Sequence, residues 1–344
     1  MKRKPIKRIW FFLALVTIAA GCTTPATPPA TESTSGATAA ISADNANSLK
    51  HILQVDSGED AASVAWAADG SAVWVVNPNG ASLYASESLD MIGMYESGPE
   101  AVVYDVSSDG DSALVSMGGS ALEIFDASSG GISTRIPAEY PFASASFSPD
   151  GSLAAVPAMD AWEVTIWDTD SGEAVQTLTG FETAAPVYDA FFGAHSDTLI
   201  WTARATVQPM TISSESMGPP LYHEDFVSAV AISPDGQMIA TSAAATIGDS
   251  FQPAITLWDA ASGEILRQVG IPTAVNALDF SPDGNLIAAG TQDGILILTS
   301  PEGGTAGKIT IDGEGVFSLN FSPDGTYLLA GGSSGTVQIF AVIP

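Results

Sequence analysis

The sequence predicts an all-β fold made of seven copies of one short unit. Three observations predict it. The tetrapeptide Ser-Pro-Asp-Gly recurs along the chain, an apolar run precedes and follows each copy, and 33 glycines and 21 prolines separate the short apolar runs. Proline presets the second position of a tight turn, Asp suits the third and Gly the fourth, so each copy predicts a β-hairpin. No amphipathic helical pattern is found after the N-terminal region.

The spacing of the turn motif sets the number of units. Four full copies end at Gly151, Gly236, Gly284 and Gly325, and two weaker copies end at Gly70 and Gly110. The gaps between successive glycines are 40, 41, 85, 48 and 41 residues. Because the longest gap holds about two periods, it must contain a degenerate copy, which we place around His195. Residues 49–344 then hold seven units of about 42 residues each.

Residues 1–22 have the layout of a secretion signal and are not part of the fold. Five basic side chains lie within the first eight residues, and residues 9–20 form an apolar stretch that is short for a membrane-spanning helix. Small residues then precede Cys22, the one cysteine of the chain. This arrangement resembles the lipobox of bacterial lipoproteins, although Ala19 stands where Leu is usual. The resemblance implies that Cys22 is lipidated; the alternative is a plain cleaved signal with an incidental cysteine.

Residues 23–48 are rich in Thr, Pro, Ala and Ser and contain no aromatic residue, so we expect a disordered tether. Removal of residues 1–22 would leave 5 basic and 39 acidic residues, a net charge of −34. A phosphate backbone requires a basic surface, so no nucleic-acid partner is expected. The same charge disfavours binding to anionic lipid headgroups, and membrane attachment would depend on the lipid on Cys22.

The layout of one unit is clearest in residues 223–269. His223 precedes an apolar run, the turn, a second run, a loop, a third run that ends in Trp258-Asp259, a Ser-Gly-Glu turn and a fourth run. Residues 166–173 repeat the Trp-Asp and Ser-Gly-Glu pattern. The period and this layout resemble the WD40 repeat family. The resemblance implies four antiparallel strands per unit, and thus a seven-bladed β-propeller over residues 49–344.

The last unit supplies only three apolar runs, whereas an unassigned run, residues 50–55, precedes the first unit. WD40 propellers close their rings by pairing such an N-terminal strand with the last blade. That pairing covers a strand edge that would otherwise be open to other chains. We therefore expect Ile52 and Leu53 to lie beside Val337 and Ile339.

The WD40 resemblance also implies a structural role for His223. In that family a His before the first strand, a Ser or Thr on the second and the Trp of the Trp-Asp pair form a buried polar relay with an Asp. His223, Ser242 and Trp258 fit the first three positions, whereas a longer loop displaces Asp249 from the position of the Asp. We interpret His223 as a residue that stabilises its blade, not as a catalyst.

The sequence contains no recognisable catalytic or metal-binding motif. Its three histidines lie in three different units, and it has no His-Glu-x-x-His, cysteine pair or phosphate loop. Residues 331–335 match Gly-x-Ser-x-Gly, but they join two strands of a hairpin, so we interpret them as a loop. We expect no catalytic residue, metal or cofactor. The first strands look mostly apolar and small, which argues against a site in the central channel.

Binding is predicted for the face that carries the loops between second and third strands, because loops on a rigid scaffold commonly carry function. Two of these loops stand out, residues 157–163 and 243–253. They offer Trp162 and Phe251 as aromatic anchors, with Asp160 and Asp249 in an acidic rim. The alternative is that both aromatic side chains pack beneath their own loops and that the acids follow from the composition.

Together these features predict a monomeric, extracytoplasmic scaffold of the bacterial cell envelope that is anchored through Cys22 and binds a protein partner. The scaffold role is what the WD40 resemblance implies, because a fold does not by itself fix a function. Two alternatives stay open. One is an envelope assembly factor that docks peptides by edge pairing or on the loop face. The other is a propeller that binds a small ligand or ion, or performs catalysis, in its central channel.

Overall fold

The computed structural model describes most of the chain from Ala39 onward. The described residues are 39–56, 63–67, 70–77, 80–96, 101–107, 109–117, 121–126, 129–137, 144–158, 162–179, 187, 189–311, 315–332 and 335–343. They belong to one compact unit, residues 33–344. The predicted signal with Cys22, the first part of the predicted tether and Asp160 lie outside the described residues.

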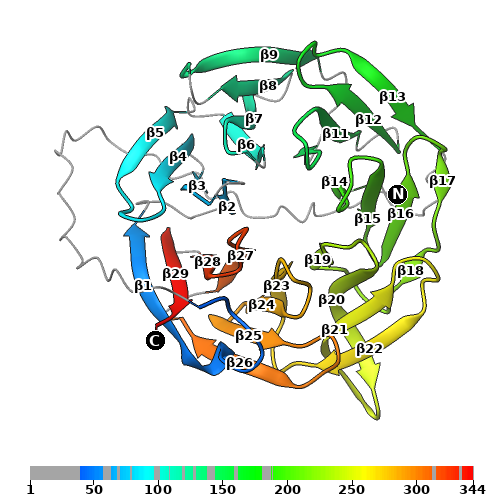
Figure 1. The fold of residues 1–344 in the computed structure, drawn as a ribbon. Coiled ribbons are helices and arrows are strands. Elements are labelled where there is room, and N and C mark those ends of the chain that lie inside the picture. The colour runs from blue at the N-terminus through cyan, green and yellow to red at the C-terminus, as the bar shows by residue number, and fades with distance from the viewer. Residues whose placement is uncertain are drawn as a thin grey trace, which may run out of the picture. The chain divides into compact units, whose positions relative to one another are not determined.

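The described chain folds into seven antiparallel sheets that are arranged in a ring as the blades of a β-propeller (Figure 1). Blade 1 contains β2 Ser63–Trp66, β3 Ala72–Asn77, β4 Gly80–Ala85 and β5 Met91–Glu96. Blade 2 contains β6 Ala101–Val106, β7 Ser112–Met117, β8 Ala121–Asp126 and β9 Gly131–Pro137. Blade 3 contains β10 Ser146–Phe147, β11 Leu153–Ala158, β12 Glu163–Asp168 and β13 Ala174–Leu178. Blade 4 contains β14 Asp189–Phe192, β15 Thr198–Ala203, β16 Thr206–Thr211, β17 Ser216–Met217 and β18 Leu221–Tyr222. Blade 5 contains β19 Ala229–Ile232, β20 Met238–Ile247, β21 Ser250–Asp259 and β22 Ile265–Gly270. Blade 6 contains β23 Val275–Phe280, β24 Ile287–Thr291, β25 Ile295–Thr299 and β26 Thr305–Thr310. Blade 7 contains β27 Val316–Phe321, β28 Tyr327–Gly332, β29 Thr336–Val342 and, from the start of the chain, β1 Leu49–Asp56. The predicted all-β, seven-bladed fold is therefore confirmed.

The first strand of each blade lies nearest the centre of the ring and the fourth lies at the rim (Figure 1). In blade 4 the fourth position is divided, because the two-residue strands β17 and β18 both pair with β16. The degenerate fourth turn is also confirmed as a hairpin: Gly193 N–H donates to the Thr198 carbonyl over 2.7 Å, between β14 and β15.

The ring closes through β1, which pairs with β29 as the outermost strand of blade 7. Leu53 lies opposite Ile339, as expected. Val55 lies opposite Val337, and Ile52, which lies at a bulge between His51 and Leu53, packs with Leu53 against the cluster that contains Val337 and Ile339. The closure and its expected neighbours are thus confirmed.

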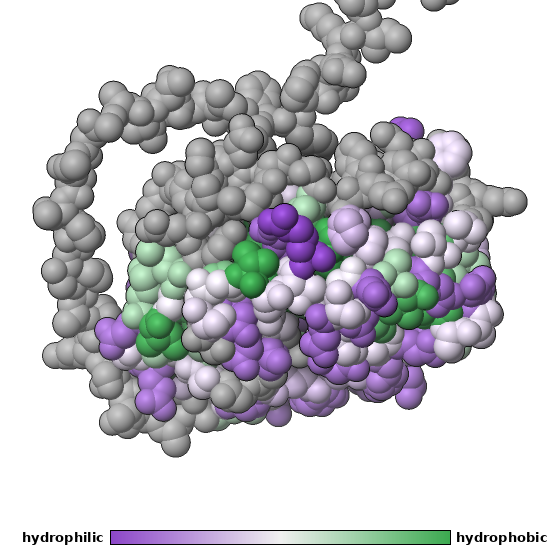
Figure 2. Space-filling model, turned by 90° about the horizontal axis from the view of Figure 1, so that it is seen from above, coloured by the Kyte–Doolittle hydropathy of each residue, from purple (hydrophilic) through white to green (hydrophobic). Residues whose placement is uncertain are grey.

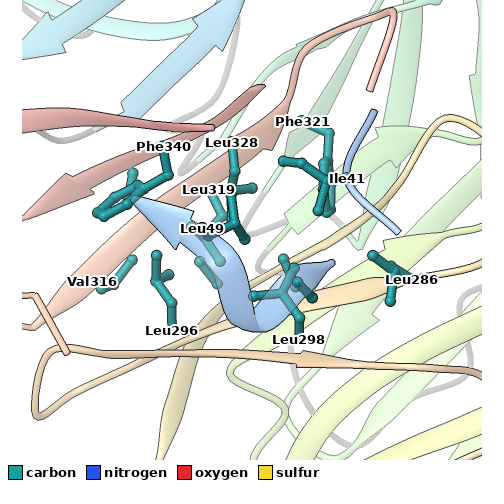
Figure 3. Packing of buried hydrophobic residues seen from close by; sticks show 14 of the residues in the cluster. Ile41, Leu49, Leu286, Leu296, Leu298, Val316, Leu319, Phe321, Leu328 and Phe340 are labelled. Atoms are coloured by element: carbon teal, nitrogen blue, oxygen red, sulfur yellow. The ribbon is translucent and has the colours of Figure 1, made fainter. Parts of the chain in front are cut away.

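The segment before β1 packs against the propeller, although we had expected residues 23–48 to be a free tether. Ile41 and Ala46 are buried, and Ile41 N–H donates to the Gly325 carbonyl over 2.8 Å. The 3-10 helix η1, Ala46–Ser48, then leads into β1. Figure 3 shows Ile41 beside Phe321 within the apolar cluster between blades 6 and 7. The ordered propeller therefore includes residues 39–48.

The repeated turn has one set of hydrogen bonds in its full copies. In the copy at residues 148–151, Gly151 has φ +72° and its N–H donates to the Ser148 carbonyl over 2.8 Å. The Ser148 hydroxyl donates to Asp150 over 2.6 Å and accepts the N–H of Leu153 over 2.9 Å. These contacts recur at Ser233, Ser281 and Ser322, so the positions predicted for Pro, Asp and Gly are confirmed.

The core lies at the seams between blades. The buried apolar residues of the described chain form seven clusters, and each cluster joins two neighbouring blades. Burial of apolar side chains at these seams is the main force that holds the ring together. Within the part of the chain that the structure describes, no helix combines the length and the apolar character that a membrane crossing requires.

Candidate functional site

The most distinct feature of the propeller surface is a long hairpin on blade 5. Strands β20 and β21 have ten residues each, whereas the second and third strands of the other blades have five to seven. Their pairing continues to Ile247 opposite Ser250, so residues 243–253, expected to be a loop, are mostly a continuous two-stranded arm. The additional residues extend the arm by roughly 10 Å, and in Figure 1 it projects beyond the outline of the ring.

A hydrogen-bonded contact holds the arm against the loop before β19. The Glu224 carboxylate accepts the Thr246 N–H over 3.0 Å and the Thr246 hydroxyl over 2.7 Å. These two donors lower the pKa of Glu224, so the carboxylate remains charged well into the acidic range. The loop and the arm therefore form one surface with a fixed arrangement.

Three aromatic side chains are exposed on or next to these two elements: Phe226 in the loop, Phe251 in the arm, and Tyr222 at the end of β18 in blade 4, just before the loop. The exposed fractions are 71% for Tyr222, 50% for Phe226 and 60% for Phe251. Phe251 lies directly opposite Thr246 in the arm, so its side chain leaves the same face that Glu224 contacts. We call Tyr222, Phe226 and Phe251 the blade-5 aromatic surface. Sequence reasoning missed Tyr222 and Phe226, although both flank His223 in an otherwise polar stretch.

The other predicted binding residues are placed differently. Trp162 is 47% exposed and has φ +50°, at the start of β12 in blade 3. Asp249 is exposed at the tip of the blade-5 arm. No contact between Trp162 and this arm is seen in the described residues, and blade 4 separates their two blades. Of the expected pair, Phe251 is the one that other exposed aromatic residues accompany.

The rim of the propeller also exposes apolar side chains, but they follow single outer strands. Met91, Ile92 and Met94 lie on β5, and Ile265 and Leu266 lie on β22. On the side of the molecule that Figure 2 shows, hydrophobic residues form small separate groups among hydrophilic ones. Scattered exposed apolar residues are ordinary in soluble domains, so these need no ligand to explain them.

His223 belongs to a buried relay, as expected, but one member differs. Its Nε2 lies 2.8 Å from the Thr241 hydroxyl, which also accepts the Trp258 indole N–H over 2.8 Å. The expected member, Ser242, is the next residue on β20, and successive side chains of a strand point to opposite faces. Burial lowers the pKa of His223, with the backbone of Ala205 and Leu221 opposing the shift. A neutral, buried imidazole of this kind stabilises blade 5.

Polar side chains lie on three of the first strands, contrary to the expectation of mostly apolar first strands. Each occupies the same position in its blade, two residues before the first residue of the repeated turn. We call this position the channel position. Asp105 accepts the N–H of Phe147 over 2.8 Å, and Asp279 accepts that of Phe321 over 2.7 Å. Asn320 accepts the N–H of Trp66 over 3.1 Å. Each of these side chains thus connects its own blade to the next one.

Two of these carboxyl groups have shifted pKa values. Burial raises the pKa of Asp105 to about 6, although N–H groups from the backbone oppose the shift. Burial raises the pKa of Asp279 to about 7, against the N–H groups of Phe321 and Phe280 and the Asn320 amide. Asp189 also faces this region, and its negative charge contributes to the raised pKa of Asp105. No group of three His, Cys, Asp or Glu residues within the described ranges is arranged to hold a metal ion.

The ring of seven blades defines the protein as a seven-bladed β-propeller, and a buried His-Thr-Trp relay lies in its fifth blade. The family model "WD domain, G-beta repeat" matches residues 221–249, 265–299 and 308–340. Each match begins in the outer strands of one blade and continues into the next, so the sequence repeat is offset from the sheets.

A short part of the chain is similar to the small ribosomal subunit protein RACK1z of Arabidopsis thaliana. The identity is 35% over 75 residues. The match covers 22% of this chain and 21% of that protein, so it spans about a fifth of the relative's length.

Proposed function

We propose that this protein is a non-enzymatic scaffold of the bacterial cell envelope, anchored by a lipid on Cys22, which binds a protein partner at the blade-5 aromatic surface. The observation that carries the proposal is the pair of hydrogen bonds between Glu224 and Thr246, which joins the loop that carries the exposed Phe226 to the arm that carries the exposed Phe251. WD40 repeats are typical of protein-interaction scaffolds, which agrees with this role.

The expected partner presents apolar side chains beside Lys or Arg. Aromatic residues such as Phe251 are frequent anchors of protein interfaces, and holding them in place reduces the entropy lost on binding. Asp225 and Asp249 lie exposed on the same loop and arm. The chain carries 39 acidic and 10 basic residues in total, so its field favours a basic partner and disfavours an acidic one.

Site-specific photocrosslinking in native membranes tests this surface. A benzophenone amino acid at position 222 or 251 should capture the same protein, and the captured amount should fall with rising salt. The matched control carries the probe at Val175, which is exposed on the rim strand β13. A Phe226→Ala substitution should reduce the capture from position 251. Equal capture from position 175, or capture that Phe226→Ala leaves unchanged, would contradict the proposal.

The anchor is tested separately by mass spectrometry of the N-terminal peptide. A mature N-terminus at Cys22 with the added mass of acyl chains is expected, together with loss of membrane association in Cys22→Ser. An unmodified N-terminus, or Cys22→Ser that stays on the membrane, would exclude the lipid anchor. This result is independent of the blade-5 surface, because the aromatic residues lie in a different part of the chain.

A further inference from the structure

The channel contains a row of backbone N–H groups whose direction follows from the strand pairing. In an antiparallel ladder, residues alternate between those that hydrogen-bond the partner strand and those whose N–H points away from it. Ser148 N–H donates to Leu153 on the partner side, so the preceding Phe147 N–H points away from β11, toward the channel. Asp105 accepts this N–H from the channel position of blade 2.

Blades 4 and 5 have the same geometry. Gly193 N–H donates to Thr198, and Ser233 N–H donates to Met238, so Phe192 N–H and Ile232 N–H point toward the channel. The side chains at the preceding channel positions, however, make no hydrogen bond with these two N–H groups among the described residues. Before blade 4, the Ser146 hydroxyl donates to the Ala190 carbonyl over 3.2 Å. Before blade 5, the channel position is Phe191, whose side chain has no polar atom.

Both uncapped N–H groups lie in the wall of one pocket. It has a volume of about 280 Å³ and is bounded by β14, β19 and the turn that follows each of them. Among its lining residues are Phe191, Phe192, Ile232, Leu278 and Asp279. No hydrogen bond from either N–H to any described residue is present. The pocket therefore combines two backbone donors with apolar side chains, whereas the equivalent N–H groups of Phe147, Phe321 and Trp66 are capped by a side chain of the preceding blade.

We propose that this pocket binds a small neutral molecule whose carbonyl oxygen accepts hydrogen bonds from Phe192 N–H and Ile232 N–H. The ligand oxygen takes the place that a carboxylate or amide oxygen occupies beside Phe147, Phe321 and Trp66. The apolar walls take an apolar body, and the volume lies near the lower limit for small-molecule sites. A negative ligand is disfavoured by the Asp279 carboxyl group in the wall and by the acidic charge of the chain.

Amide NMR spectra of the full chain test the proposal with three probes of one shape: benzamide, benzoate and benzylammonium. Benzamide should shift the Phe192 and Ile232 amide resonances in a saturable way. Benzoate should bind at least about tenfold more weakly because of the Asp279 carboxyl group, and benzylammonium, which has no acceptor for the two N–H groups, should not shift these two resonances. If either ion binds as tightly as benzamide, or if benzamide shifts other amides and not these two, the proposed site is wrong.

Substitutions at the channel position separate the capping effect from packing. Phe191→Asn places at this position the side chain that Asn320 uses to cap Trp66 N–H, so benzamide binding should weaken about tenfold. Phe191→Leu leaves the N–H groups uncapped and should keep the affinity within about threefold. Ala65→Asn makes the same polar change at the channel position of blade 1, away from the pocket, and should have no effect. Equal affinity of the Asn and Leu variants would overturn the proposal.

Discussion

Replacing Asp279 with Asn should change how the stability of the propeller depends on pH. Burial raises the pKa of Asp279 from 3.8 to about 7, so the folded protein holds this proton more tightly than the unfolded chain does. Its contribution to stability is therefore fully present below about pH 4 and is lost as the pH rises to about 7. The shift corresponds to a loss of about 4 kcal/mol at ~1.4 kcal/mol per pKa unit, as an upper limit.

Asn does not titrate, so the free energy of unfolding of the wild type relative to Asp279→Asn should fall by up to about 4 kcal/mol between about pH 4 and pH 8. Urea unfolding followed by tryptophan fluorescence at several pH values measures it. Asp150→Asn is the control with the opposite sign and a lower pH range: the hydroxyls of Ser148 and Ser152 lower the pKa of Asp150 from 3.8 to about 2, so its contribution to stability is lost only as the pH falls below about 4. Parallel curves for the wild type and Asp279→Asn would show that channel water hydrates this carboxylate, and the burial argument would be refuted.

Two further predictions concern the stability of other parts of the ring. Thr241→Val should lower the free energy of unfolding in urea by about 2–4 kcal/mol, because it leaves His223 and the Trp258 indole buried without their shared hydroxyl group. The neighbouring Ser242→Ala should cost less than about 1 kcal/mol. Equal losses for the two variants would disprove the relay. Ile41→Ala should lower the free energy of unfolding by about 2–4 kcal/mol, because the side chain is buried at the seam of blades 6 and 7. An unchanged thermal midpoint would mean that residues 39–48 behave as a free tether.

The fold could be predicted because its main signal is local. The Ser-Pro-Asp-Gly turn needs only its own few residues: Ser148 bonds Asp150, and Gly151 closes the turn with a positive φ. Such a motif can be recognised wherever it occurs, and its spacing counts the blades. Even the degenerate copy around His195 could be located, because the period required a hairpin there.

The parts that could not be predicted depend on contacts between distant residues. Asp105 and Asp279 lie within mostly apolar strands, and only the closed ring places each beside the backbone of the next blade. The sequence predicted Ser242 as the relay member, whereas the structure has Thr241. Both residues carry a hydroxyl group, and only the strand register decides which of the two faces the relay. Ile41 is an isolated apolar residue in a polar segment, and no periodicity marked it as buried.

The candidate binding surface was predicted in part. Phe251 was found because a long stretch between two strands is visible in the sequence. Tyr222 and Phe226 were not, because they lie outside that stretch, and the Glu224–Thr246 contact that joins the loop to the arm connects residues that are distant in sequence. Sequence reasoning grouped Phe251 with Trp162 by chemical type alone, whereas proximity is set by the order of the blades.

The pairing of β1 with β29 has a consequence for how the chain acquires its structure during synthesis. Six blades consist of consecutive strands and can form in turn as the polypeptide emerges, but β1 has to wait until β29 has been made. Until then the earliest strand of the propeller and the growing seventh sheet both present unpaired edges, which favours misassociation with other chains. The contact between residues 49–56 and 336–342 closes a very long loop, so we expect it to be the slow, final step of folding.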